Sequence, residues 1–175
     1  IGFRDMKIIS QAEEFVASHQ LSDGGIATYH EDVVKDMGYI IPHGWSSSHS
    51  CVTALAVNQL RDAEVLRKAL AFLRCRIEKK GPEGYWWKTG YYVLYELGRS
   101  GSTIFSHDPV EVSLFLLLQS KLRIPNLDLI QRLLTLQRED GSMPSSQLFR
   151  IPRPNQLSDE LVGTEEIVED RHFIF

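Results

Sequence analysis

The sequence predicts an all-α protein made of stacked helical hairpins that form part of a two-layer ring, an α/α toroid. Apolar residues recur at helical spacing in several stretches that are separated by turns rich in glycine and proline. An acidic residue directly precedes glycine at positions 23, 83 and 140, which are 60 and 57 residues apart. Half-polar helices also alternate with more uniformly apolar ones, as outer and inner layers require.

The first repeat is expected over approximately residues 4–60. Its outer helix spans about 4–20, where apolar residues fall at near-helical spacing, and it ends at Gly24-Gly25. Residues 26–45 show no sustained period and predict a long loop. The three serines at 46–48 offer N-caps to an inner helix over about 46–60.

The second repeat is expected over approximately residues 61–122. Asp62 caps a helix over 63–78, which Gly81-Pro82 ends. The aromatic segment Tyr91–Tyr95 is interpreted as a short strand or a loop packed over the core. Pro109 in a first turn then begins a helix over 110–122 that is apolar almost all round, so we expect it to be central.

The third repeat is expected over approximately residues 126–175. An amphipathic helix over 127–137 ends at Asp140-Gly141, a second long loop covers 142–164, and a further inner helix begins near 168. The chain thus provides three outer helices. A complete ring needs about twice as many hairpins, so we expect half a toroid: a fragment, or a protomer that a partner chain completes.

Composition narrows the class of protein. A chain of 175 residues with 43% apolar and 24% charged residues fits one soluble domain. The net charge of -4 gives no basic footprint, so no nucleic-acid partner is expected. The longest apolar run is far shorter than the roughly 20 residues of a membrane span, which leaves only peripheral membrane contact. Two distant cysteines suit free thiols and a cytoplasmic location.

The acidic turns carry a family resemblance. Residues 137–142 (Gln-Arg-Glu-Asp-Gly-Ser) and 20–25 (Gln-Leu-Ser-Asp-Gly-Gly) are two matching copies of one motif. A middle copy at residues 81–86 lacks the Gln and the Asp. This pattern resembles the terpenoid cyclase and protein prenyltransferase superfamily, with the α/α toroid of the squalene-hopene cyclase type. The turn residues themselves are interpreted as structural: Asp binds turn amides, Gly permits the reversal, and Gln bridges to a neighbouring helix.

The resemblance implies a place for an acid. In the resembled cyclases an Asp-rich motif at the head of an inner helix protonates an alkene or epoxide. This sequence has no Asp-x-Asp-Asp, and Glu169 and Asp170 occupy the equivalent place. We therefore take Asp170, Glu169 and Asp108 as candidate catalytic residues, with helix capping as the alternative role of Asp170 and Asp108.

A binding site is expected where the heads of the inner helices converge on one rim. His49 marks the first head, and His107, Asp108 and Glu111 mark the second. Helix N-termini at such a mouth suit an anion such as a diphosphate. The alternative is that these residues are satisfied caps and rim side chains.

Aromatic residues supply the expected apolar wall of this site. Trp45, Trp86 and Tyr91 are candidates to line an isoprenoid pocket. The alternative is that they only pack between neighbouring repeats. Prenyltransferases of the superfamily hold zinc, which suggests Cys51, His107, Asp108 and His172 as a set. The closely spaced Asp and Cys pair of those prenyltransferases is missing from this sequence. No metal or cofactor is therefore predicted, with zinc or magnesium as the alternative.

These observations predict a terpenoid cyclase-like or prenyltransferase-like protein that binds an isoprenoid, or another apolar small molecule, in a central cavity. Acid-initiated cyclisation is the reaction that the resemblance implies. One alternative is a catalytically silent toroid that acts as a binding or interaction module. The other is a carbohydrate-active α/α barrel, in which paired carboxylates would do acid–base work.

Overall fold

The structure, a computed structural model, describes residues 5–40, 43–98, 107–146, 148–157 and 166–167. Within these residues it contains α-helices, one 3-10 helix and a two-residue antiparallel strand pair, so the all-α prediction is confirmed. The elements are α1 (Met6–Ser18), α2 (Glu31–Asp36), η1 (Gly44–Ser46), α3 (Ser50–Val57), α4 (Ala63–Lys80), α5 (Tyr91–Leu97), α6 (Pro109–Lys121), α7 (Leu127–Leu136), β1 (Arg150–Ile151) and β2 (Glu166–Ile167).

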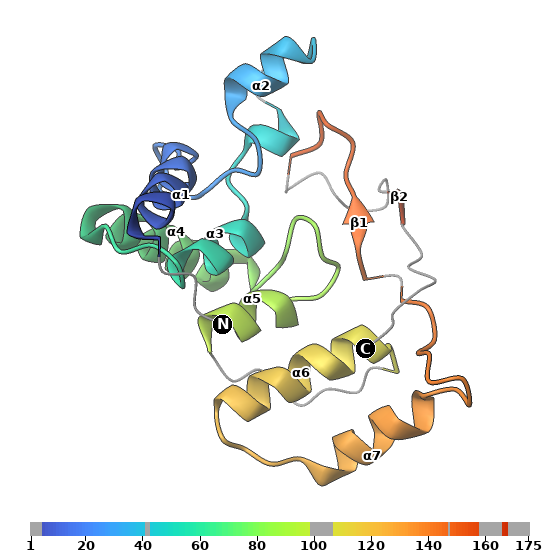
Figure 1. Cartoon of the computed structure of the whole chain (residues 1–175). Helices are drawn as coiled ribbons and strands as arrows, with labels where there is room; N and C mark the ends of the chain where they lie inside the picture. Colours follow the sequence, from blue (N-terminus) through green and yellow to red (C-terminus); the bar gives the residue numbers. More distant parts are fainter. Residues whose placement is uncertain (1–4, 41–42, 99–106, 147, 158–165, 168–175) are drawn as a thin grey trace.

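The helices α4, α3, α5, α6 and α7 pack in a row in this spatial order, so α5 lies against α3 rather than against its sequence neighbour α4. α3 packs on α4 and on α5, α5 packs on α6, and α6 packs on α7. Figure 1 shows α1, α3 and α4 grouped at one end of this row and α7 at the other, with α2 standing apart at the top. None of the helices in the described ranges is long and apolar enough to cross a membrane.

The three predicted outer helices are α1, α4 and α7. They lie where the sequence predicts them, because local hydrogen bonds set their ends. Asp62 accepts from the backbone N–H groups of Glu64 and Val65, each at 2.9 Å, and so begins α4. Gly81, with a φ of 79°, ends it. Asn126 accepts from the N–H of Leu129 at 3.0 Å at the start of α7.

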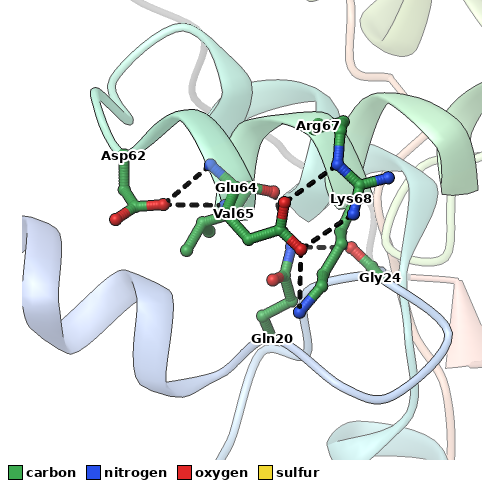
Figure 2. A network of polar contacts seen from close by, with 7 residues as sticks. All are labelled: Gln20, Gly24, Asp62, Glu64, Val65, Arg67 and Lys68. Atoms are coloured by element: carbon green, nitrogen blue, oxygen red, sulfur yellow. Dashed lines mark hydrogen bonds and ion pairs between the residues drawn. The ribbon is translucent and has the colours of Figure 1, made fainter.

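The first acidic turn binds α1 to α4. The amide nitrogen of Gln20 donates to the carbonyl of Gly24 at 3.1 Å and to that of Val65 at 2.8 Å (Figure 2). A carboxylate oxygen of Asp23 accepts from the N–H of Gly25 at 2.9 Å. The glutamine therefore bridges two outer helices and the aspartate holds the turn, as their residue types predicted.

The third acidic turn repeats the local half of this pattern. Gln137 donates to the carbonyl of Gly141 at 2.9 Å, and Asp140 accepts from the N–H of Ser142 at 2.9 Å. The hydroxyl of Ser142, which donates to Asp140 at 2.7 Å, and the N–H of the same residue hold the pKa of Asp140 below its ordinary value. The two matching copies of the motif thus share a turn of the same kind.

Two short elements differ from the sequence-based expectation. The 26–45 loop contains α2, whose six residues are too few to show a helical period. The N-cap of α3 is His49, which makes no side-chain cap hydrogen bond, rather than one of the three serines. Ser46 instead lies in η1 and bonds back to the carbonyl of His43 at 3.2 Å.

The aromatic segment Tyr91–Tyr95 is neither a strand nor a loop but the start of α5. Its tyrosines favour strands, yet the segment lies between two core clusters and packs against both of them. Val93, which is 0% exposed, and Tyr92 pack against the α3–α4 side, whereas Tyr91 and Leu94 pack against the α6 side. The predicted 142–164 loop similarly contains β1, which pairs with β2.

The core is divided among these interfaces. One cluster of buried residues joins α3, α4 and α5 around Cys51, Ala54, Leu73, Tyr85 and Val93. Another joins α5, α6 and α7 around Val112, Phe115, Leu118 and Leu129. Because α6 lies between α5 and α7 and contributes to the second cluster, its central position is confirmed.

Candidate functional site

Aromatic rings from two separate loops meet beside the head of α3. Trp45 stacks on Tyr29 with ring centroids 5.4 Å apart and contacts Trp86 at 6.2 Å. Further ring contacts extend the group, so that it forms one connected set of rings. We call this set the aromatic cluster, and its members are Tyr29, Tyr39, His43, Trp45, His49, Tyr85 and Trp86.

His49 fixes the geometry of the cluster. Its Nε2–H donates to the carbonyl of Gly44 at 2.7 Å, and its Nδ1 accepts from the hydroxyl of Thr28 at 2.9 Å. The indole N–H of Trp86 donates to the same hydroxyl at 2.8 Å. His49 also stacks on Tyr85 with centroids 3.8 Å apart and an interplanar angle of 11°. This chain of bonds locks Trp86 against the imidazole.

The imidazole of His49 is neutral. It is 0% exposed, and burial lowers its pKa from 6.5 to about 3, with Arg76 adding a smaller effect in the same direction. One ring nitrogen donates and the other accepts, which is the hydrogen-bonding pattern of the neutral ring. The structure therefore shows His49 as a satisfied, cluster-building residue.

A single stretch of chain, which we call the rim segment (residues 144–146 and 148–157), passes the heads of α3, α5 and α6. Near α3, the indole N–H of Trp45 donates to the carbonyl of Pro152 at 3.0 Å, and the hydroxyl of Tyr85 donates to that of Gln156 at 2.7 Å. Before α5, the N–H of Lys88 donates to the carbonyl of Leu148 at 2.7 Å. With the hydrogen bond from Ser146 to Asp108 at the head of α6, these contacts place the heads of α3, α5 and α6 along one rim.

The head of α6 is occupied by its own carboxylates. Asp108 accepts from the N–H groups of Val110 and Glu111 at 2.9 and 3.2 Å and from the hydroxyl of Ser146 at 2.8 Å. Glu111 accepts from the hydroxyl of Thr89 at 2.6 Å. Because Asp108 takes these free amides, this helix end is a poor place for a diphosphate.

The structure brings some of the predicted site residues together and separates others. Trp45, Trp86 and His49 meet in the aromatic cluster. Tyr91 lies apart from it and contacts Phe115 at 5.2 Å. The remaining candidates are placed as follows: Asp108 and Glu111 at the head of α6, His107 exposed just before it, and Asp170 and Glu169 outside the described residues.

The suggested zinc set is not assembled in the described part of the chain. Cys51 lies in the α3–α4–α5 core, where burial raises the pKa of its thiol, and His107 is exposed. His172 falls outside the described residues. Among the residues that the structure does describe, no group of three or more His, Cys, Asp or Glu side chains has the geometry to hold a metal ion.

Sequence reasoning missed several residues that build the rim. His43, Thr28, Thr89 and Ser146 are polar loop residues without a motif, and their contacts reach across 21 to 38 positions or, for His43, involve ring packing. Three of the four, His43, Thr89 and Ser146, are buried, and Thr28 is half-buried. Burial of a loop residue could not be read from the local pattern.

Comparison with known proteins gives similarity in structure alone. No protein-family model matches the sequence, and no curated protein matches it. The type II terpene cyclase MstE from Scytonema, in its apo form, matches with a TM-score of 0.62 and 22% identity over 93% of this chain and 62% of that chain. A protein from Actinoplanes matches with a TM-score of 0.55 and 20% identity over 81% of this chain and 53% of that chain.

A variant of MstE in complex with geranylgeranyl dihydroxybenzoate, its substrate, matches with a TM-score of 0.66 and 23% identity, over 91% of this chain and 57% of that chain. The chain therefore spans less than two thirds of the length of each of these proteins. Identity at this level speaks for fold and not for activity. The chain thus has an all-α, terpenoid cyclase-like fold that matches part of the α/α toroid of a type II terpene cyclase.

Proposed function

We propose that the protein is terpenoid cyclase-like and binds an isoprenoid, or another apolar molecule with a prenyl-type chain, against the aromatic cluster. The observation that carries this proposal is the meeting of Trp45 and Trp86 at the rim shared by the inner helices. Indole faces pack well on alkene chains and stabilise nearby positive charge, which suits a carbocation. Support also comes from the similarity in fold to a cyclase solved with a prenylated substrate.

Acid-initiated cyclisation would in addition need a carboxylic acid to protonate the ligand. Asp108 is committed to the head of α6 and to Ser146, so it is a poor proton donor. Within the proposal we assign the acid to Asp170, with Glu169 beside it. Both residues lie outside the described part of the chain.

Binding can be tested by the quenching of tryptophan fluorescence on titration with geranylgeranyl dihydroxybenzoate. Trp86→Leu removes one aromatic wall, and the loss of about 1.5 kcal/mol of contact predicts roughly tenfold weaker binding. Trp87→Leu is the matched control, because Trp87 stacks on Tyr92 at 4.8 Å and contacts Phe149, outside the cluster. Equal effects of the two substitutions, or no binding by the unaltered protein, would refute the proposal.

Turnover is a separate test, read by mass spectrometry of the bound prenyl compound after incubation. Asp170→Asn should abolish product formation while leaving binding intact, whereas Asp108→Ala should mainly lower stability because it removes the cap. A protein that binds the probe and forms no product would instead be a catalytically silent binding module. That second candidate is favoured by the engagement of Asp108 in structural hydrogen bonds.

A further inference from the structure

Two buried histidines lie in the same loop, but only one is satisfied. Both ring nitrogens of His49 have partners, as described above. His43 is 1% exposed, and its Nδ1 accepts from the backbone N–H of Trp45 at 3.2 Å. Its proton therefore resides on Nε2. Within the described residues, this Nε2 is buried and has no hydrogen-bond partner.

An unmet donor of this kind is costly and calls for an explanation. A buried N–H without an acceptor has lost its hydrogen bond to water and gained none in return, and most buried polar atoms in folded proteins have a partner. The neighbours of the His43 ring are Tyr39, at a centroid distance of 4.7 Å, and Trp45, at 5.9 Å. Aromatic rings accept hydrogen bonds far more weakly than oxygen does. The donor thus lies beside rings of the aromatic cluster without an oxygen partner among the described residues.

We propose that the Nε2–H of His43 is a ligand-binding donor for an oxygen atom of the molecule that the aromatic cluster holds. The ligand class is an apolar or aromatic body that carries a carbonyl, carboxylate or hydroxyl oxygen. The body packs on Tyr39 and Trp45 while the oxygen meets His43. This inference rests on the proposed function, because it names the polar end of the same ligand.

The neutral state of His43 agrees with this role. Burial lowers the pKa of the imidazole, so the ring keeps one N–H and one acceptor at neutral pH. The acceptor is used by the Trp45 backbone, which fixes the tautomer and leaves the N–H for the ligand. A neutral donor can bind an uncharged oxygen as well as a carboxylate.

Two substitutions distinguish the role of Nδ1 in the His43 ring from the role of Nε2. His43→Asn keeps an acceptor near the position of Nδ1, toward the Trp45 amide, and removes the distal donor. His43→Gln extends an N–H to the position of Nε2 and loses the proximal acceptor. A merely structural role of His43 predicts that Asn is the better replacement, whereas a ligand-binding role predicts that Gln is.

The test uses three probes with the unaltered protein and both variants: geranylgeranyl dihydroxybenzoate, geranylgeranyl benzene without the oxygens, and dihydroxybenzoate without the chain. We expect the unaltered protein to bind the first probe about tenfold more tightly than the hydrocarbon, as one hydrogen bond of about 1.4 kcal/mol allows. His43→Asn should erase that difference, and His43→Gln should keep most of it.

The outcomes distinguish failure of the inference about His43 from failure of the proposed function. Binding of both prenyl probes without any effect of His43 would overturn the inference and leave the proposed function standing. Binding of dihydroxybenzoate alone that depends on His43 would support the inference and overturn the isoprenoid ligand, and no binding at all would overturn both. Should His43→Asn not fold, the 15N resonance of Nε2 in the unaltered protein decides. It should shift on adding the oxygenated probe, and an unchanged resonance refutes the inference.

Discussion

Acid should destabilise the protein through His49, and the size of this effect can be worked out. The folded state holds the imidazole neutral with a pKa of about 3, because it is buried, whereas an unfolded histidine titrates near 6.5. Between these values the unfolded chain binds more protons than the folded one. The contribution of His49 is therefore fully present above pH 6.5 and is lost progressively as the pH falls toward 3.

The expected loss follows from the distance below the unfolded pKa. At pH 4.5, two units below 6.5 and still above the folded value, the loss is about 2.7 kcal/mol, since each unit corresponds to about 1.36 kcal/mol. This is a large share of the roughly 5–15 kcal/mol that stabilises a typical domain. Carboxylates also titrate in this range, so only a comparison with a variant isolates the histidine.

The assay is urea unfolding of the unaltered protein and of His49→Gln from pH 7.5 to 4.5. Glutamine retains a donor for the Gly44 carbonyl but does not titrate, so the variant should begin less stable and the gap should narrow by about 2.7 kcal/mol. His107→Gln, which replaces an exposed histidine by the same residue, is the matched control. Parallel stability curves for the unaltered protein and His49→Gln would refute the reasoning.

Three further predictions concern the scaffold. Gln20→Ala removes the bridge to α4 and should cost about 1–2 kcal/mol in urea unfolding, whereas Gln137→Ala, whose bond is local and exposed, should cost less than about 0.5; equal losses would contradict the bridging role. Gly44→Ala places a methyl group against the Gln156 carbonyl and should expose the rim segment to protease, and an unchanged digestion pattern would contradict the contact. Asp62→Ala should cost about 1 kcal/mol by thermal unfolding, with Asp62→Asn nearly neutral as the control, and equal losses would speak against the cap.

Much of the scaffold was readable from the sequence because its signals are local. The Asp62 cap acts on residues two and three positions further on, and the Asp140 turn bond spans two positions. Such contacts form wherever the residue types stand at the right spacing, whatever the rest of the chain does. The outer helices and the acidic turns were therefore predicted correctly.

The short elements were harder, because seven residues carry too little periodicity to choose between helix and strand. Tyr91–Leu97 contains tyrosines and a valine that favour strands, and burial between two core clusters decided in favour of a helix. In the candidate site, too, the tertiary structure decided what residue type alone could not. Trp45 and Trp86 were predicted from aromatic content alone, yet Tyr91 has the same character and lies against α6.

The sequence by itself thus determined the helical repeat, the caps and turns, and the residue types available at the rim. Only the tertiary structure decided which of them meet, because Trp45 reaches the Pro152 carbonyl across 107 positions of chain. It likewise decided that the two loop histidines differ, one with both ring nitrogens paired and the other with a buried N–H unpaired within the described residues. The physical reason is that burial and long-range hydrogen bonding depend on how distant segments pack, and no local pattern encodes that packing.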